Sequence, residues 1–321
     1  MIHAIALTGP TASGKTALSL GIAEALGCEI ISLDSMQIYK YMDIGTAKAT
    51  KEERARVPHH MVDFLSPDES FSAKAYKDMA MQCAEDISQR GKIPLFVGGT
   101  GLYLSTLIRP DCEEPPESDP EYRKRIERTL TDESKRIELH ERLRQIDPRS
   151  AEGVHYNNTR RVIRALEIFD ATGKTKTYFD DLTKRKNDEL TLTHVTLDFH
   201  ERENLYGRVD ARVDIMLREG LLDEIRDLLD RGYLSPETTA AQAIGYKELI
   251  GALRGEKTLK CATEELKQYS RNYAKRQLTW FRNTADKTSV YVDTEDGKMR
   301  TYDDLIKECV SIFSTALKGK E

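Results

Sequence analysis

The clearest indication of the fold lies in Gly9-Pro10-Thr11-Ala12-Ser13-Gly14-Lys15-Thr16, which matches the pattern G-x-x-x-x-G-K followed by Ser or Thr. Glycines allow consecutive backbone N–H groups to turn inward around phosphate oxygens, and a helix that follows contributes the positive end of its dipole. Lys15 can supply a mobile positive charge, and the Thr16 hydroxyl can ligate Mg²⁺. Residues 9–16 are therefore predicted to bind a di- or triphosphate, although the pattern does not say which one.

The sequence around this motif alternates between strand-like and helix-like segments. The short apolar runs are residues 2–7, 29–33 and 93–97, and the segments with helical spacing are 16–26 and 74–90. This order predicts an α/β fold in which a parallel sheet carries helices on both faces. In such folds ligands bind beyond the carboxyl ends of the strands, which is where the motif lies.

The character of the chain changes near Pro110. Four prolines in an acidic stretch (Pro110, Pro115, Pro116 and Pro120) predict a linker, and Asp119-Pro120 predicts a helix start with Asp as the N-cap. The expected organisation is an α/β core in residues 1–112, an all-helical insertion in 113–195, and a second, mainly helical part of the core in 196–321. His59 and His60, which follow Pro58, are expected in a loop.

Composition excludes several classes of protein. The 321 residues include 49 Lys and Arg against 54 Asp and Glu, so the formal net charge of −5 excludes a globally cationic nucleic-acid coat but allows a local basic face. Hydrophobic residues make up 39% and charged residues 32%, which indicates a folded core. No apolar run approaches the roughly 18 residues of a membrane span. Five scattered cysteines without a C-x-x-C pair predict reduced thiols in a cytoplasm, with no zinc site.

Two further segments lie where strands are predicted to end. Asp34, after the second strand, could bind a metal or act as a general base, or it could cap a turn through Ser35. Gly98-Gly99-Thr100-Gly101, after the third strand, allows a close backbone approach and offers the Thr100 hydroxyl, although an ordinary tight turn has the same composition. Among the first hundred residues, Asp34 is the candidate carboxylate for this edge.

Two basic features point to anions. Residues 268–282 contain four basic and no acidic residues interleaved with aromatic ones, a pattern that suits RNA, although the alternative is a solvated helix face with Trp280 and Phe281 in the core. Arg208 and Arg212, four residues apart on a predicted helix, could clamp a diphosphate or could pair with Asp210 and Asp214 as surface ions.

Several segments together resemble the tRNA dimethylallyltransferase (tRNA isopentenyltransferase) family in its bacterial form. The matching stretches are GPTASGKT at 9–16, DSMQIYKYMDIGTAK at 34–48, VPHH at 57–60, PLFVGGTGLYL at 94–104, NNTRRVIRALEIF at 157–169, RVDARVDIMLREGLLDEI at 208–225, AAQAIGYKEL at 240–249 and YAKRQLTWFR at 273–282. They follow one another in order over nearly the whole chain, which makes the resemblance specific.

The resemblance implies transfer of a dimethylallyl group from dimethylallyl diphosphate to the exocyclic amine of the adenosine 3′-adjacent to the anticodon in tRNA. The diphosphate would then be the leaving group, bound by Gly9, Pro10, Thr11, Ala12, Ser13, Gly14, Lys15 and Thr16, with Mg²⁺ as cofactor on Thr16. The catalytic residues implied are Lys15, Asp34, Thr100, Arg208 and Arg212, and Asp34 would take the proton of the amine.

The resemblance also implies a set of tRNA contacts and a helical insertion that clamps the anticodon stem. The implied tRNA-binding residues are Asp34, Ser35, Met36, Gln37, Thr100, Arg123, Arg160, Arg161, Arg164, Gln242, Gly245, Lys247, Lys275, Arg276, Gln277, Trp280 and Arg282. The expected partners are the tRNA anticodon stem-loop and dimethylallyl diphosphate, with no membrane, and the expected form is a cytoplasmic monomer.

Two other functions would also use this motif. The first is a small-molecule kinase that uses ATP, and the second is an RNA-binding module whose phosphate loop has lost its role. A kinase of small metabolites has no need of the basic segment at 268–282, and the intact Gly14, Lys15, Thr16 and Asp34 disfavour the second.

Overall fold

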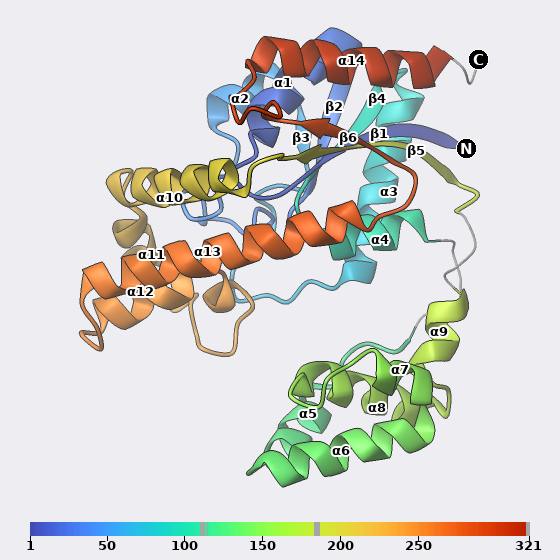
Figure 1. The fold of residues 1–321 in the computed structure, drawn as a ribbon, viewed down its shortest axis with the longest axis vertical. Coiled ribbons are helices and arrows are strands. Elements are labelled where there is room, and N and C mark those ends of the chain that lie inside the picture. The colour runs from blue at the N-terminus through green and yellow to red at the C-terminus, as the bar shows by residue number, and fades with distance from the viewer. Residues whose placement is uncertain (110–112, 114, 183–186, 319–321) are drawn as a thin grey trace. The chain divides into compact units, whose positions relative to one another are not determined.

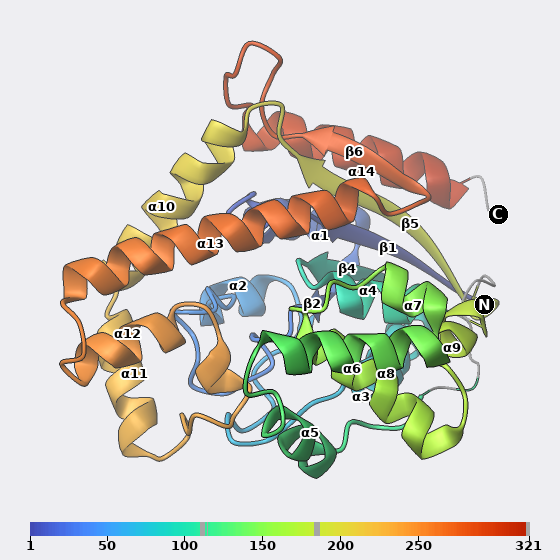
Figure 2. The same ribbon diagram turned by 60° about the horizontal axis from the view of Figure 1, so that its bottom comes forward.

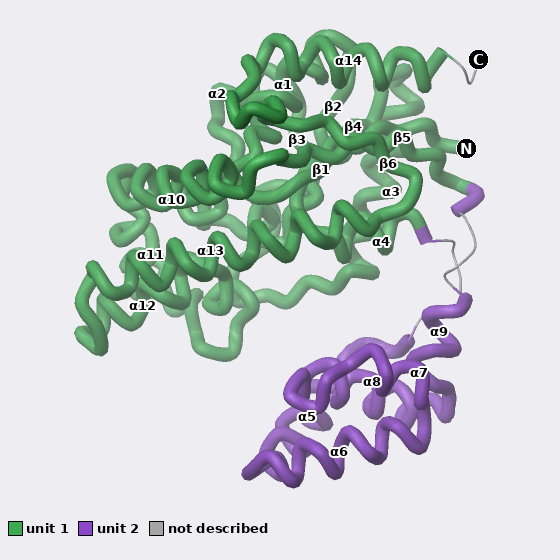
Figure 3. The backbone as a smooth tube through the Cα atoms, viewed as in Figure 1, with its two compact units in different colours: residues 1–108, 189–321 green, residues 109–188 purple. Residues whose placement is uncertain are grey.

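The computed structural model describes residues 1–109, 113, 115–182 and 187–318, so Pro110 and Cys112 of the predicted linker lie outside the described residues. The chain divides into two compact units (Figure 3): unit 1 contains residues 1–108 and 189–321, and unit 2 contains residues 109–188. Unit 2 ends at residue 188 and not at the expected 195, because residues 190–196 pair with the first strand of the sheet.

Unit 1 contains the sheet and the helices that surround it (Figure 1). Its strands are β1 (Ile2–Thr8), β2 (Cys28–Leu33), β3 (His59–His60), β4 (Ile93–Gly98), β5 (Leu190–Asp198) and β6 (Lys287–Tyr291). Its helices are α1 (Lys15–Leu26), α2 (Lys51–Arg56), α3 (Ala73–Gln89), α4 (Gly101–Ile108), α10 (Arg202–Arg218), α11 (Leu221–Asp230), α12 (Tyr246–Leu253), α13 (Leu259–Arg282) and α14 (Tyr302–Lys318), with a 3-10 turn at Ala240–Gln242.

The sheet is parallel and has the strand order β3-β2-β4-β1-β5-β6. From β1 the chain continues to β2 on one side of the sheet, and from β5 it continues to β6 on the other. The connections from the neighbouring strands β1 and β5 thus leave in opposite directions. In parallel sheets ligands bind outside the carboxyl ends of the strands at such a reversal, and the motif at 9–16 begins at the carboxyl end of β1. The α/β fold predicted from the sequence is confirmed.

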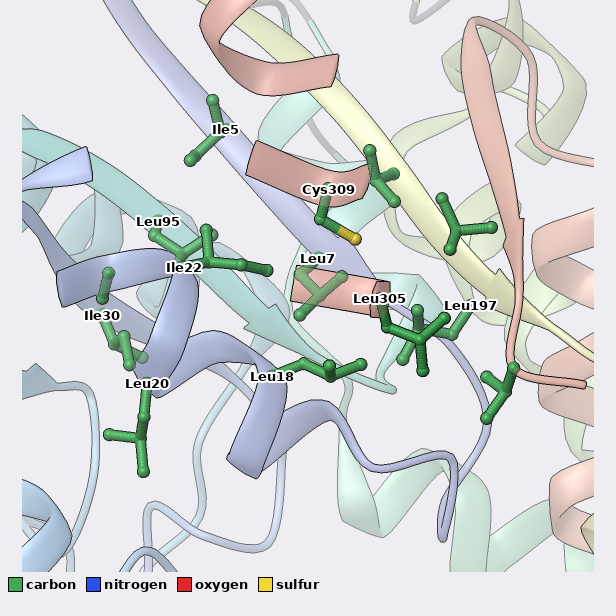
Figure 4. Close-up of a cluster of buried hydrophobic side chains, with 14 of the residues drawn as sticks. Ile5, Leu7, Leu18, Leu20, Ile22, Ile30, Leu95, Leu197, Leu305 and Cys309 are labelled. Carbon is green, nitrogen blue, oxygen red and sulfur yellow. The ribbon is translucent and has the colours of Figure 1, made fainter. Parts of the chain in front are cut away.

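Side chains of β1 alternate between the two faces of the sheet. Ile5 and Leu7 belong to a cluster that α1 and α14 cover, and Figure 4 shows Leu18, Leu305 and Cys309 packed around them. Ala4 and Ala6 belong to a second cluster on the opposite face, which α3 and α4 cover. Burial of a side chain such as Leu or Ile stabilises the fold by about 1.5–3 kcal/mol. The period-2 alternation therefore explains why helices are needed on both faces.

Helices α10 to α13 form a third hydrophobic cluster around Val213, Leu221, Tyr246 and Leu266. Figure 2 shows these helices grouped at one side of unit 1. Ile38 and Met42, from the segment that follows Asp34, are buried in the same cluster. The packing of these helices thus fixes the backbone beside the end of β2.

One predicted secondary-structure assignment is wrong, and one strand was not predicted. His59 and His60, expected in a loop, form the edge strand β3, which pairs with Ile30 and Ile31 of β2. Residues 287–291, in the part of the core predicted to be mainly helical, form β6, for which no strand was predicted, and pair with β5. Both strands are short, with no long apolar alternation, so their conformation depends on hydrogen bonds to a neighbouring strand.

Unit 2 is a small helical bundle with its own core around Leu143, Val162 and Leu166. Its helices are α5 (Pro120–Glu127), α6 (Glu133–Ile146), α7 (Pro148–Glu152), α8 (Thr159–Thr172) and α9 (Lys176–Leu182). The predicted helix start is confirmed, because the Asp119 carboxylate accepts the Glu121 N–H at 2.9 Å. Among the described residues of either unit, none of the helices combines the length and apolar content that a membrane crossing requires.

Candidate active site

The loop between β1 and α1 has the curled backbone that the motif predicts. Gly9, Ala12 and Gly14 have φ angles of +148°, +61° and +95°. A Cβ on Gly9 would lie 3.0 Å from the Leu197 carbonyl oxygen, so the close approach to β5 also favours glycine. Helix α1 starts after Gly14 without a hydrogen bond from a capping side chain and without an acidic residue in its first turn. Its N-terminal N–H groups therefore form an end suited to an anion.

The Lys15 side chain folds back over this loop. Its Nζ donates to the Gly9 carbonyl oxygen at 2.9 Å and to that of Pro10 at 2.7 Å. Burial, followed by the charge of Arg212, lowers the pKa of Lys15 to about 7, while the Asp34 carboxylate acts in the opposite direction. The loop thus concentrates positive charge at a place where a bound phosphate would favour the charged form of the lysine.

The two arginines of α10 interact with the site in different ways. Arg208 Nε donates to the Ala12 carbonyl oxygen at 2.7 Å, and its Nη2 donates to the Tyr302 hydroxyl at 3.2 Å. Arg212 is surrounded by charges of the site: burial lowers its pKa, Asp34 opposes that effect, and Arg208 adds to it. Arg208 therefore braces the loop, and Arg212 is the arginine whose charge interacts with those of both Lys15 and Asp34.

The alternative in which these arginines pair with their own helix neighbours is wrong. Asp210 accepts from Arg271 at 2.7 Å, and Asp214 pairs with Lys267 at 2.7 Å, so both carboxylates hold α10 against α13. Asp210 and Asp214, which could neutralise Arg208 and Arg212 according to the sequence, instead pair with basic residues of α13.

Asp34 follows the carboxyl end of β2, and its two oxygens differ: one caps a turn, and the other could serve as a base or a metal ligand. Its Oδ1 accepts the Met36 N–H at 2.9 Å and the Gln37 N–H at 3.4 Å, so it caps a turn, although through these two residues and not through Ser35. Within the described part of the chain, no hydrogen bond to Oδ2 is found, and the Asp34 charge acts on Lys15 and Arg212. One oxygen therefore orients the carboxylate and leaves the other for chemistry.

Thr100 is fixed beside Asp34 by the glycine turn after β4. Its N–H donates to the Leu33 carbonyl oxygen at 3.0 Å, and its Oγ1 accepts the Ser35 N–H at 3.1 Å. A Cβ on Gly98 would clash with Leu33, so the turn can approach β2 only with glycine at this position. The predicted close approach of this segment thus brings Thr100 and Asp34 to the same edge of the sheet.

Helix α13 carries the basic segment, but only part of it is available to a partner. Lys275 and Arg276 are exposed, and the Arg276 guanidinium lies 5.8 Å from the centre of the Tyr273 ring. Arg282 is committed to the Asp198 carboxylate at 2.7 Å and to the Phe199 carbonyl oxygen at 2.9 Å. Of the four basic residues in 268–282, Arg271 and Arg282 are therefore held by Asp210 and Asp198, which leaves Lys275 and Arg276 as the candidates for contact with a partner.

Two further residues of α13 that were predicted to contact tRNA face inward. Gln277 is buried, and its amide is hydrogen-bonded to the backbone of Thr11 and of Gly99. Trp280 is half-buried and covers Gly101, where a Cβ would overlap its indole ring. These contacts replace the predicted RNA contact for Gln277, and they favour the core alternative for Trp280.

The segment around the start of α12 also contains both exposed and buried residues among those predicted to contact tRNA. Gln242 and Lys247 are exposed, and the Gln242 side chain donates to the Pro236 carbonyl oxygen at 2.9 Å. Gly245 is buried, with its N–H bound to the Glu248 carboxylate at 2.8 Å, so a direct contact of Gly245 with RNA is not supported. Ser35, Met36 and Gln37 are half-buried beside Asp34.

Unit 2 holds the remaining predicted tRNA contacts, and they also differ in exposure. Arg160 and Arg161 are exposed at the start of α8. Arg164 donates to Glu167 at 2.7 Å and to the Pro116 carbonyl oxygen, and Arg123 lies 3.6 Å from the same Glu167 carboxylate. Arg123 and Arg164 thus stabilise the bundle, while Arg160 and Arg161 remain candidates for phosphate contacts.

The donor atoms present fit a magnesium ion held largely by phosphate and water. No cluster of three or more His, Cys, Asp or Glu that could hold a metal is found within residues 1–109, 113, 115–182 and 187–318. Thr16 offers its hydroxyl in the first turn of α1, and the nearby Ser13 Oγ is buried without a hydrogen-bond partner. Because Mg²⁺ commonly keeps several waters and takes ligands from phosphates, one protein hydroxyl is a sufficient anchor.

Sequence reasoning missed the residues that position the site. Tyr302, at the start of α14, covers the phosphate loop: a Cβ on Gly14 would lie 3.0 Å from its ring. Glu224 accepts the N–H groups of Asp43, Ile44 and Gly45 at 2.8, 2.7 and 3.0 Å, which holds the loop after Asp34. These contacts join residues about 180 or more positions apart in the chain, so no local sequence signal could have indicated them.

A parallel sheet whose β1 leads into a phosphate-binding loop, with a carboxylate at the end of β2, defines an α/β protein of the P-loop class. A family model described as IPP transferase matches residues 37–284. The chain therefore belongs to the IPP transferase family.

The family model begins after the phosphate loop, but the similarity to individual proteins covers nearly the whole chain. A tRNA dimethylallyltransferase from Thermoanaerobacter sp. is 39% identical over 317 residues, which cover 98% of this chain and 99% of that protein. A tRNA dimethylallyltransferase from Bacillus velezensis is 49% identical over 282 residues, 87% of either chain.

Two solved structures have the same fold. The full-length tRNA isopentenylpyrophosphate transferase of Bacillus halodurans matches with a TM-score of 0.71 and 41% identity, covering 100% of this chain and 98% of that chain. A eukaryotic dimethylallyltransferase acting on tRNA matches with a TM-score of 0.76 and 31% identity, covering 91% and 74%.

Proposed function

We propose that this protein is a prenyl transferase that moves a dimethylallyl group from dimethylallyl diphosphate to tRNA. The acceptor is the exocyclic amine of the adenosine 3′-adjacent to the anticodon, and diphosphate is released. The observation that carries the proposal is the placement of Asp34 beside Lys15 and Arg212 at one edge of the sheet, in a chain of the IPP transferase family. A carboxylate and a cationic phosphate loop are the two groups that this reaction needs.

The reaction breaks one bond and forms another at the same carbon. The allylic C–O bond of the donor breaks as the amine nitrogen of adenine forms a C–N bond, and the electron pair of the C–O bond leaves with the diphosphate. The Asp34 oxygen that does not cap the turn would accept the proton that the amine loses. General-base help of this kind is typically worth about 10²- to 10⁴-fold in rate.

Negative charge grows on the diphosphate as the C–O bond stretches. Lys15, Arg212 and the N–H groups at the start of α1 would stabilise that charge. The proposal is supported by the hydrogen bonds of Lys15 to the loop and by the helix end that no acidic residue neutralises. Thr16 would hold the Mg²⁺, which supplies additional positive charge to the diphosphate when it is bound. Arg208 would act through the Ala12 carbonyl oxygen, by keeping the loop in shape.

The acceptor must be an adenine that has left its stack, since an amine inside the stacked loop could not reach the crevice. Lys275, Arg276, Arg160 and Arg161 are exposed basic residues that suit phosphates of the anticodon stem-loop. The predicted clamping by unit 2, the monomeric state and the cytoplasmic location are parts of the same proposal.

The small-molecule kinase remains the less favoured function. It shares the phosphate loop, so Lys15 and Thr16 do not separate the two. The similar proteins are named as transferases acting on tRNA, and the exposed basic residues of α13 have no role with a small acceptor.

The test is an assay with purified protein, Mg²⁺, dimethylallyl diphosphate and unmodified tRNA, followed by mass analysis of the nucleosides. We expect one adenosine per tRNA to gain a dimethylallyl group. Phosphorylation of a small acceptor with ATP, without any prenylated nucleoside, would establish the kinase instead.

A further inference from the structure

Gln277 of α13 lies between the phosphate loop and the turn after β4. Its Oε1 accepts the Thr11 N–H at 2.8 Å, and its Nε2 donates to the Gly99 carbonyl oxygen at 2.8 Å. Its exposed fraction is 7%, so both amide atoms are used inside the protein. The side chain therefore joins two loops that carry opposite halves of the site.

The fit of Gln277 against these loops is close. A Cβ on Gly99 would clash with the Gln277 amide, so glycine at this position is what admits the side chain. Gly99, whose carbonyl oxygen accepts from Gln277, immediately precedes Thr100 in the turn after β4. Thr100 in turn accepts the Ser35 N–H at 3.1 Å, next to Asp34. The Gln277 hydrogen bonds and the backbone of Gly99 and Thr100 thus connect the phosphate loop with the residue next to Asp34.

We propose that Gln277 is a positioning residue, which holds the diphosphate loop in shape and at a fixed separation from the Thr100–Asp34 side. The proposal rests on the proposed function, because it assigns the two sides to donor and acceptor. A displacement of about 1 Å between reacting groups can reduce a rate about 10²-fold. The Gln277 amide limits such displacements because it is hydrogen-bonded to both loops. Since the side chain is buried, no solvent water takes the place of these hydrogen bonds.

The experiment compares Gln277→Met with wild type. Methionine has nearly the same length and volume but leaves the Thr11 N–H and the Gly99 carbonyl oxygen without partners. The matched control is Gln82→Met, which makes the same change on the exposed face of α3. Calorimetry with inorganic diphosphate and Mg²⁺ gives the affinity of the loop, and filter binding gives the affinity for tRNA.

We expect Gln277→Met to weaken diphosphate binding about 10-fold, which corresponds to the loss of one modest interaction. The tRNA dissociation constant is expected to stay within about twofold of wild type, and the control to change neither quantity. A KM for dimethylallyl diphosphate that rises while the KM for tRNA stays constant would support the same assignment, because a general loss of stability does not separate the two substrates.

Diphosphate affinity within about twofold of wild type in folded Gln277→Met would overturn the proposal. Loss of tRNA affinity with unchanged diphosphate affinity would also overturn it and make Gln277 an RNA contact. If Gln277→Met does not fold, Gln277→Asn decides by the same two measurements, since its amide is too short to reach both loops. Wild-type protein that binds diphosphate but prenylates no tRNA would refute the proposed function and leave the assignment of Gln277 measurable.

Discussion

The Asp34 carboxylate shows how a single residue can be both structural and reactive. Its Oδ1 is bound by the Met36 N–H at 2.9 Å, and this bond orients the second oxygen. Sequence patterns could indicate a carboxylate at a strand end, but they could not show that one of its oxygens caps a turn while the other remains available to a ligand. That division depends on the turn that follows β2.

Replacement of Asp34 by asparagine isolates the proton-accepting role. Asp34→Asn keeps an oxygen that can accept the Met36 N–H, so the turn should persist, while the base is lost. We expect the single-turnover rate of prenyl transfer to fall about 10²- to 10⁴-fold, with affinities for tRNA and diphosphate close to those of wild type. Rapid-quench measurement of the prenylated nucleoside gives the rate, and an unchanged rate would remove Asp34 from the reaction.

Lys15 makes diphosphate binding dependent on pH. Burial, followed by the charge of Arg212, lowers the pKa of Lys15 to about 7 in the free protein. A bound anion favours the ammonium form and raises this pKa, so binding takes up a proton above about pH 7 and weakens as pH rises further. Calorimetry of diphosphate binding at about pH 8, in buffers of different ionisation enthalpy, should show that wild type takes up protons on binding. Lys15→Met should take up fewer. Equal uptake in both proteins would assign the proton to another group.

Helix α13 is an element with three separate roles along its length. Arg271 pairs with Asp210 of α10, Gln277 bridges two loops, and Arg282 is bound to Asp198 of β5. Lys275 and Arg276 are the basic residues that remain exposed between them. Helical periodicity gives the stripes of such a helix, but it does not say which stripe faces another element.

The exposed basic residues of α13 should contribute to tRNA affinity through phosphate. Arg276→Ala is expected to weaken tRNA binding and to reduce the slope of log K against log salt by about one, because one phosphate contact fewer releases fewer counterions. Filter binding at several salt concentrations measures this slope. Arg271→Ala, which removes an internal ion pair with Asp210, serves as the control and should leave the slope unchanged. The same slope in Arg276→Ala as in wild type would give Arg276 a purely structural role.

The whole molecule consists of two units that have separate cores. The residues of unit 2 lie between α4 and β5 in the sequence, so the sheet of unit 1 is completed only after the chain has passed through unit 2. Every residue of the phosphate loop and both catalytic candidates at the strand ends belong to unit 1. The division indicates that donor binding is a property of unit 1 alone.

Removal of unit 2 tests this division. A chain in which a flexible Gly/Ser linker replaces residues 109–188 is expected to fold and to bind diphosphate within about threefold of wild type, because the hydrophobic clusters of unit 1 contain no residue of unit 2. Its tRNA affinity should fall at least 10-fold if Arg160 and Arg161 contact phosphate. Calorimetry and filter binding measure the two affinities. A folded chain that no longer binds diphosphate would contradict the separation.

Local sequence determined much of this protein. The eight residues at 9–16 specify their own loop because glycine positions and a following helix are local properties. Short apolar runs specified β1, β2 and β4, and the Asp119-Pro120 pair specified the start of α5. The carboxyl ends of parallel strands meet at one edge, so the proximity of Asp34 and Thr100 to the phosphate loop could also be predicted.

Tertiary structure alone decided which of the polar side chains are free to act. Arg208 and Arg212 look equivalent in the sequence, but Arg208 donates to the Ala12 carbonyl oxygen, whereas the buried charge of Arg212 interacts with Lys15 and Asp34. Gln277 and Arg282 look like RNA contacts until the loop and the strand that bind them are known. The physical reason is that a side chain whose polar atoms are all bound within the protein is less available to a ligand. The loop and strand partners of Arg208, Gln277 and Arg282 lie 83 to 266 positions away in the sequence.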